Sequence, residues 1–178
     1  MEQHLVYDLG VESLFSGIRA RVTPDLKHAV RALGIDLDKK LLPAYPKQVW
    51  VEVVDAVARA ISPGVAASQA HRELGHAISA GFADSVMGRL MAPGVRLMGV
   101  RRMMLRLPKS LTMSNNFMRV TAVETGPCAV RVDVNEAIPS ADFLCGVIEA
   151  IGGYAGARRC EVSASGAGQV SFSVTWTE

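Results

Sequence analysis

The sequence has no long apolar run and none of the usual signs of export. Its first residues, Met1 to Leu5, contain neither a basic nor an apolar segment, so we expect no signal peptide. The most apolar stretch, Val49 to Ile61, is interrupted by Glu52, Asp55 and Arg59. No stretch reaches the ~18 uninterrupted apolar residues that a membrane-spanning helix needs. We therefore expect a cytoplasmic protein without a membrane span.

Cysteine is scarce as well. The chain contains only three, Cys128, Cys145 and Cys160, which are odd in number and far apart in the sequence. None belongs to a Cys-x-x-Cys pair, so the sequence indicates neither a disulfide framework nor a zinc site. We expect reduced thiols, as in most cytoplasmic proteins.

The motifs of catalysis and of cofactor binding are also missing. His71 and His76 are five residues apart, which is not the spacing that places two metal ligands on one helix face. Cys145 falls on the apolar stripe of an expected helix, where a thiol is inert. The segment Gly152 to Gly156 follows an expected helix, whereas a dinucleotide-binding loop follows a strand. His28 alone could ligate a haem iron, but no other residue marks a haem pocket. We expect no enzymatic activity, no metal and no cofactor.

The overall composition is that of a folded globular protein. Of the 178 residues, 49% are hydrophobic and 20% are charged, and the formal net charge is +2. The length predicts a single domain over residues 1–178. So small a net charge creates no overall field toward nucleic acid or membrane. Because no known nucleic-acid-binding motif occurs either, we expect no nucleic-acid partner.

The first part of the chain, residues 1–110, has the apolar spacing of helices. Thr23 and Pro24 suit an N-cap and a first helical position, and Gly81 and Pro93-Gly94 predict breaks. Leu41 to Pro46 contains two prolines and is expected to be a stiff connector. The expected helices cover residues 11–21, 24–33, 47–61, 66–80, a short segment ending at 91, and 95–107.

The last part, residues 115–178, changes to the alternating period of strands with one buried face. Between two expected hairpins, Ser140 is placed to cap a helix. The expected strands cover residues 117–124, 128–134, 158–164 and 170–176. We therefore predict an α+β fold in which about five to six helices precede a β-β-α-β-β antiparallel unit.

The local charge is uneven. Between Asp84 and Glu124 the chain has seven basic residues and no acidic one. A helix over residues 95–109 would carry its basic side chains on one face and its apolar ones on another. The basic face would contact an anionic group or an acidic partner, unless acids from elsewhere in the fold compensate it as an ordinary solvated face. The expected basic contacts are Arg101, Arg102, Arg106 and Lys109, and the expected apolar face comprises Leu97, Val100, Met103, Met104 and Leu107.

Methionine gathers in the same region, at positions 87, 91, 98, 103, 104, 113 and 118. Thioether side chains fill irregular cores, and they also line adaptable pockets. The first interpretation is a plain core. The second is an apolar ligand pocket between helices and sheet, in which Arg101 or Arg102 fixes an anionic group. The residues predicted to line such a pocket are Trp50, Met87, Met91, Met103, Phe143 and Val147.

A series of short motifs resembles a family of uncharacterised myxobacterial proteins of similar length. The resemblance spans nearly the whole chain, and it implies no biochemical role. In order, the motifs are Leu41-Leu42-Pro43-Ala44-Tyr45-Pro46 with Trp50, Asn115-Asn116-Phe117, Val123-Glu124-x-Gly126-Pro127, Asn135-Glu136 and Phe143-x-x-Gly146.

The order of helices and strands is similar to that of haem nitric-oxide-binding domains, 4-vinyl-reductase-type domains and transport-particle subunits. This likeness implies a domain that senses or holds a small molecule, or an assembly subunit. The haem branch implies a Tyr-x-Ser-x-Arg motif, which this sequence lacks.

Two functions follow from these observations. The first is a non-catalytic regulatory or sensory domain that binds a small, largely apolar ligand. The second is an interaction or assembly subunit without a ligand, either a homodimer or a protein that docks to a partner through the basic helix 95–109.

Overall fold

The structure, a computed structural model, describes residues 3–166 and 168–178. In this part of the chain six α-helices precede β3, and the remainder follows the order β-β-α-β-β, which confirms the α+β prediction. The elements are β1 (Leu5–Tyr7), α1 (Asp8–Gly17), the 3₁₀ helix η1 (Arg19–Arg21), α2 (Pro24–Ala32), β2 (Ala44–Pro46), α3 (Lys47–Ile61), α4 (Ala67–Asp84), α5 (Val86–Leu105), α6 (Leu107–Leu111), β3 (Val120–Gly126), β4 (Ala129–Val134), α7 (Ala141–Tyr154), β5 (Arg159–Ser165) and β6 (Val170–Thr177).

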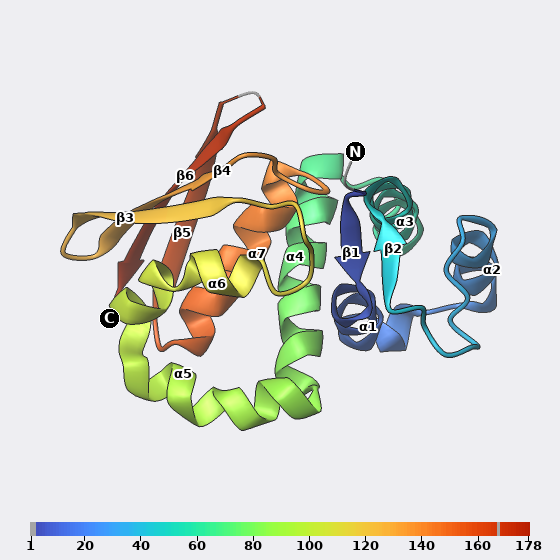
Figure 1. Cartoon of the computed structure of the whole chain (residues 1–178), viewed down its shortest axis with the longest axis horizontal. Helices are drawn as coiled ribbons and strands as arrows, with labels where there is room; N and C mark the ends of the chain where they lie inside the picture. Colours follow the sequence, from blue (N-terminus) through green and yellow to red (C-terminus); the bar gives the residue numbers. More distant parts are fainter. Residues whose placement is uncertain (1–2, 167) are drawn as a thin grey trace.

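The four later strands form one antiparallel sheet in the order β3-β4-β6-β5. At its centre, every second residue of β4 and β6 is apolar and buried, which gives the sheet one apolar face. Helix α7 packs against β5 and β6 (Figure 1). The Ser140 hydroxyl caps this helix by accepting a 3.2 Å hydrogen bond from the Phe143 amide, as predicted. The buried cross-strand pairs are Val130–Val174, Val132–Phe172 and Val134–Val170.

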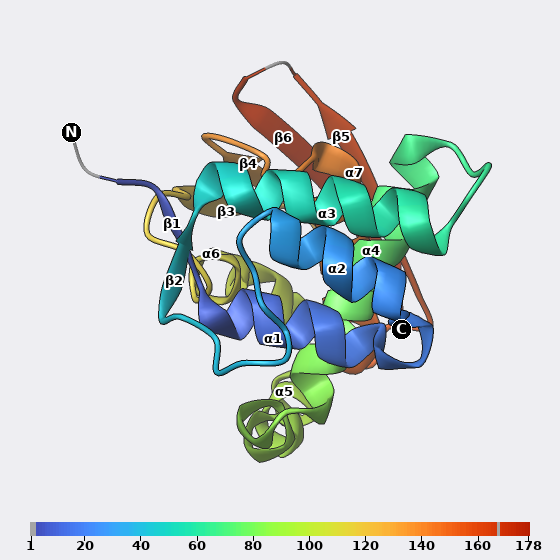
Figure 2. The same cartoon turned by 90° about the vertical axis from the view of Figure 1, so that its right-hand side faces the viewer.

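Helix α4 is central to the helical part, with α7 packed on one side and α1 on the other (Figures 1 and 2). Both crossings depend on glycine. A Cβ atom at Gly75 or Gly146 would collide with the backbone across the α4–α7 crossing, and one at Gly17 or Gly81 would collide across the α1–α4 crossing. The helix backbones can therefore approach more closely than any larger residue would allow.

The predicted break at Gly81 is wrong for the same reason. Helix α4 continues through this residue to Asp84, and Gly81 is buried against the backbone of Ser13 and Gly17. A glycine within a helix destabilises it, but close packing against a neighbouring helix can offset that cost. Here the glycine marks a helix crossing, and the helix ends at Asp84, with Ser85 as its C-cap.

The stiff connector expected over Leu41 to Pro46 is partly a strand. Ala44–Pro46 forms β2, which pairs antiparallel with β1 and aligns Tyr45 with Val6. Val6 also forms a bridge with Asn115, so the chain entering β3 meets the N-terminal ribbon. The first helix begins at Asp8 and ends at Gly17, with η1 after it, instead of running over residues 11–21. Three-residue strands are too short to produce an alternating pattern, so periodicity could not indicate them.

Helix α5 differs most from its expected form. Pro93 and Gly94 lie inside it, and the interruption occurs at Gly99, whose backbone has φ +72° and ψ 167°. The Ser85 hydroxyl caps its start by accepting a 3.0 Å hydrogen bond from the Gly88 amide. In Figure 1, α5 leaves the end of α4 and curves back to α6. The helix expected over residues 95–107 is therefore two segments with different orientations.

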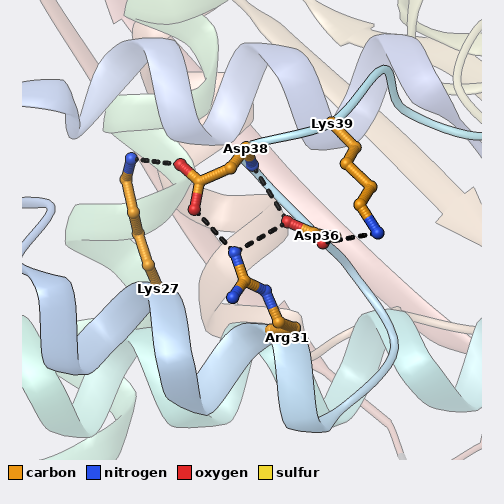
Figure 3. Close-up of polar contacts among 5 residues, drawn as sticks. All are labelled: Lys27, Arg31, Asp36, Asp38 and Lys39. Carbon is orange, nitrogen blue, oxygen red and sulfur yellow. Dashed lines mark hydrogen bonds and ion pairs between the residues drawn. The ribbon is translucent and has the colours of Figure 1, made fainter.

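An exposed cluster of ion pairs joins α2 to the loop that follows it (Figure 3). Asp38 accepts hydrogen bonds from Lys27 and Arg31, each at 2.6 Å, and Asp36 accepts one from Arg31 at 3.1 Å. The hydrogen bond from the Asp38 amide lowers the pKa of Asp36, and the Lys27 ammonium lowers the pKa of Asp38. Exposed ion pairs individually contribute little to the free energy of unfolding. The structural effect of this cluster is to hold the loop against α2.

A second ionic network ties α4 to α7 and β5. The Glu149 carboxylate accepts hydrogen bonds from the Arg72 guanidinium, one at 3.0 Å from Nε, and from His76 at 3.0 Å. Arg72 also donates to the Val162 carbonyl at 2.7 Å. Burial alone would raise the pKa of Glu149, but the hydrogen bonds from Arg72 and His76 and the charge of the Arg72 guanidinium hold that pKa below its usual value. The network keeps a half-buried carboxylate ionised at the helix crossing.

No helix in the described residues is long and apolar enough to cross a membrane.

The helix crossings give a test of the fold. We expect Gly75→Ala to lower the free energy of unfolding by about 3 kcal/mol, because the new methyl group would force the α4 and α7 backbones apart. The matched control is Gly153→Ala on α7, where no atom lies within 4 Å of the place that a Cβ atom would occupy. That change should raise stability by about 0.5–1 kcal/mol. Urea unfolding measures both, and equal stability of the two variants would contradict the close crossing.

Candidate functional site

A cavity of about 350 Å³ lies among the helices. Most of its lining side chains are apolar, and a volume in this range suits a small-molecule ligand. Its walls are β1, α1, α3, α4, α5, α6, the segment 113–118 and α7, with Ile138 from the loop before α7. The contributions of α4, α5 and α7 are Ile78, Ser79, Phe82, Ala83, Gly88, Met91, Ala92, Val95, Arg96, Met103, Phe143, Leu144, Val147, Ile151 and Tyr154.

Five of the six residues predicted to line a pocket do line this cavity: Trp50, Met91, Met103, Phe143 and Val147. Trp50 and Phe143 meet edge to face with ring centroids 6.3 Å apart, an arrangement that aromatic pairs favour. Met87 is different, because its side chain is 49% exposed and is not part of the lining. The structure thus brings together residues that are nearly 100 positions apart in the sequence.

The cavity is among helices, and not between helices and sheet as expected. No residue of β3, β4, β5 or β6 belongs to its lining. Helix α7 turns Phe143, Leu144, Val147 and Ile151 toward the cavity and packs against β5 and β6 elsewhere. The α7 helix therefore lies between the sheet and the cavity. Some of its residues line the cavity and others pack against the sheet.

The methionine-rich region is divided between cavity and core. Met91, Met103, Met113 and Met118 line the cavity, while Met104 is fully buried in the core. Unbranched thioether side chains can change rotamer without large strain. A wall with several such residues can adapt to ligands of different shape.

Two polar side chains of the lining, Ser79 and Asn115, form hydrogen bonds to the protein itself. The Ser79 hydroxyl donates a 3.0 Å hydrogen bond to the Gly75 carbonyl. The Asn115 amide donates to the Leu111 carbonyl at 3.0 Å, and its oxygen accepts from the Phe117 and Met118 amides at 3.3 and 2.9 Å. Asn115 thereby shapes the loop that closes one wall. These groups leave the interior surface mostly apolar.

The cavity has a charged residue that the sequence analysis did not select. Arg96 is part of its lining, whereas Arg101, Arg102, Arg106 and Lys109 are not. Instead, Arg101 forms a two-point ion pair with Glu124, with both N···O distances at 2.7 Å. The signal for Arg96 was its spacing, because Gly88, Met91, Ala92, Val95 and Arg96 form one face of a helix.

The predicted faces of helix 95–109 are also partly wrong. Leu97, expected on the apolar inner face, is 87% exposed. Lys109 belongs to α6, beyond the turn at Arg106, and does not share a helix with Arg101 and Arg102. Leu97 departs because the positive φ of Gly99 rotates the two halves of α5 relative to each other, so one helical wheel cannot describe both. Lys109 departs because α5 ends at Leu105 and α6 begins at Leu107.

Comparisons with known proteins agree on the family and the fold. A family model described as a protein of unknown function (DUF2378) matches residues 4–177. No curated protein sequence matches the chain. Among solved structures, a Cs H-NOX mutant has a TM-score of 0.71 at 12% identity and covers 97% of both chains. A mutant T. tengcongensis H-NOX has a TM-score of 0.70 at 12% identity, with 96% of both chains covered.

A third structure concerns the mechanism of H-NOX activation and has a TM-score of 0.70 at 13% identity, covering 94% of this chain and 95% of that one. At such identities the likeness shows a shared fold only. A further structure with this fold, at 12% identity and a TM-score of 0.69, concerns haem redox potential and porphyrin distortion. Haem is therefore a group against which the lining can be tested.

The lining residues do not fit a haem. Haem iron takes an axial His, Cys or Tyr ligand, or Met together with His. None of the lining residues in the described part of the chain is a histidine or a cysteine. Tyr154 is the remaining candidate, and burial followed by the nearby Asp84 carboxylate raises its pKa, which opposes the phenolate form. The methionines would have to ligate iron without an imidazole partner.

The histidines are engaged elsewhere. His71 lies 3.0 Å from Asp55 and 2.8 Å from Ser140, and His76 contacts Glu149. His4 stacks on Phe117 with ring centroids 5.1 Å apart, and His28 is exposed on α2. In residues 3–166 and 168–178, no group of three potential metal ligands comes together.

We expect haemin added to the purified protein to keep the spectrum of free haemin, because the cavity offers no strong axial ligand. Absorbance titration in the Soret region measures this. A saturable Soret band at one haem per chain, lost in Tyr154→Phe, would show that Tyr154 ligates haem. It would contradict the conclusion that the lining does not fit a haem.

Proposed function

Because the chain belongs to the DUF2378 family of proteins of unknown function, we propose its role from the site itself: a non-catalytic sensory or regulatory domain that binds a small, largely apolar ligand. The observation that carries this proposal is the apolar cavity of about 350 Å³. Natural pockets for small molecules have this character, with mostly apolar walls and few polar groups. A cytoplasmic location is part of the proposal.

The chemistry of the cavity supports binding over catalysis. Its ionisable side chains are Arg96 and Tyr154, and general acid–base catalysis usually needs a group that titrates near neutral pH. The three thiols, which lie outside the lining, include two whose pKa burial raises to about 11, Cys145 and Cys160. Thiols with such pKa values are poor nucleophiles at neutral pH.

Helix α5 supports a mechanism by which ligand binding in the cavity changes the outer surface of the protein. One face of α5 lines the cavity, while Val86, Leu90 and Leu97 on the other face are 82%, 77% and 87% exposed. A ligand that contacts Met91 and Val95 would bias the position of α5 and hence of this exposed face. A sensory domain needs such a link between a ligand and an outer surface.

The ligand-binding proposal predicts that filling the cavity abolishes binding. Val95, half-buried in the lining, is changed to Trp, and the control is Leu97→Trp on the exposed face of the same helix. A ligand at 100 times its Kd should stabilise the wild type and the control by about 2.7 kcal/mol, which raises the Tm by roughly 5–10 °C. Differential scanning calorimetry with decanol as the first ligand measures the shift.

The Val95→Trp variant should show no shift. Met91→Trp serves as a second cavity-filling variant in case Val95→Trp does not fold. Equal shifts in cavity-filling and control variants would place the ligand elsewhere and remove the support for the cavity.

The exposed face of α5 favours a second candidate, an interaction or assembly subunit. Past Gly99, Arg102 and Arg106 are exposed as well and form no ion pair with a described residue. Exposed apolar surface together with unpaired arginines is common at protein interfaces. A homodimer or an acidic protein partner would cover this surface.

The second candidate predicts that Leu97→Asp or the double change Arg102→Glu, Arg106→Glu dissociates a self-associated species. Light scattering after size exclusion measures the mass across a concentration series. A wild type that stays monomeric at 100 µM, roughly the range of weak dimers, would rule out the homodimer.

A further inference from the structure

Among the residues that the structure describes, the cavity lining contains one charged side chain, Arg96. Neither an aspartate nor a glutamate of this part of the chain is among the lining residues. Among residues 3–166 and 168–178, no carboxylate forms an ion pair with Arg96. A guanidinium at an apolar wall without a protein counterion is available for an anionic group of the ligand.

The position of Arg96 is fixed by the helix that carries it. On α5, Met91, Ala92 and Val95 line the cavity beside it, and Arg96 itself is exposed to solvent. This places the charge at the rim and the thioether and aliphatic groups next to it. A rim guanidinium keeps its own hydration in the absence of ligand, so an empty cavity carries no penalty for a buried charge.

The remainder of α5 adds to the positive potential, while Asp84 at the end of α4 is a carboxylate that acts on the lining at Tyr154. Residues 85–123 contain no acidic residue, so no carboxylate in this segment competes for Arg96. The nearby Arg101 is neutralised by Glu124, which leaves Arg96 as the guanidinium that can pair with a group in the cavity. Local positive potential favours anions over neutral or cationic head groups.

We infer that the ligand is an anionic amphiphile, with an apolar body in the cavity and a carboxylate-type head on Arg96. This rests on the proposed function, because it names the chemical class for the same cavity. Carboxylates and phosphates both match the planar fork of a guanidinium, and the carboxylate is chosen because it is the smaller head for one arginine. An unbranched alkyl tail suits a wall of flexible methionines.

The test compares ligands that share a ten-carbon tail and differ in the head group. Isothermal titration calorimetry gives the Kd of the full-length protein for decanoate, decyl phosphate, decanol and decyltrimethylammonium. We expect decanoate to bind about fivefold more tightly than decanol and the cation to bind most weakly, since a charge pair at a solvated rim is worth a modest amount. Decyl phosphate binding more tightly than decanoate would overturn the choice of the carboxylate.

The arginine is then removed and its charge reversed. Arg96→Gln should lower the affinity for decanoate about fivefold and leave that for decanol unchanged, and Arg96→Glu should reverse the preference toward the cation. The control is Arg89→Gln, an exposed arginine on α5 outside the lining, which should change neither affinity. These are exposed positions, so folding should be preserved, and circular dichroism checks it.

The outcomes separate this inference from the proposed function. If decanoate and decanol bind equally well, and Arg96→Gln changes neither, the cavity binds apolar ligands but the anionic head is refuted. If Arg89→Gln weakens decanoate as much as Arg96→Gln does, general electrostatic attraction replaces the Arg96 contact. If none of the four compounds binds, the proposed cavity function fails together with the inference.

Discussion

The architecture depends on how closely the backbone of α4 approaches its two neighbours. Glycines on both sides of each crossing remove the side chains that would separate α4 from α1 and α7. This close contact forms a three-helix layer, and α7 then carries the sheet on its other side. Helix α5 turns away from the end of α4 and curves back to α6 (Figure 1). The cavity lies where residues of α5 face those of α1, α4 and α7.

Helix α5 has two different tasks within this arrangement. Ser85 sets its start and Gly99 changes its direction. Between these two points its inner face supplies adaptable apolar groups and one guanidinium, and its outer face presents large aliphatic side chains to solvent. An element that contacts both a ligand and the outside is well placed to transmit occupancy. The chain shares its fold with H-NOX proteins, but among its described residues the lining contains neither a histidine nor a cysteine for a haem iron.

Much of the fold could be predicted from the sequence because its periodic segments are long. The alternation in β4 and β6 and the capping serines and threonines identify strands and helix starts directly. Local patterns could not predict contacts between distant segments. Gly81 is equally consistent with a helix break and with a helix crossing, and only the tertiary contact with Ser13 distinguishes them. The three-residue strands β1 and β2 depend on each other for the same reason.

Some of the cavity residues were predictable because they belong to patterns that are visible in the sequence. Methionine clustering, aromatic side chains and the apolar stripe of the helix that Ser140 caps indicated Trp50, Met91, Met103, Phe143 and Val147. The predicted anion contacts Arg101 and Arg102 lie outside the lining, which contains Arg96 instead. Arg96 lies before Gly99 and follows the spacing of Met91, Ala92 and Val95, whereas the selected arginines lie after it. A helical wheel continued past Gly99 describes only one of the two segments of α5.

The most direct test of the central claim is native mass spectrometry of the protein as purified, beside its Val95→Trp variant. The proposal predicts a wild-type chain with an added mass typical of a small amphiphile, released on denaturation, and a variant with none. A wild type at its bare sequence mass, unchanged after incubation with decanoate and decanol, would contradict a ligand-binding cavity.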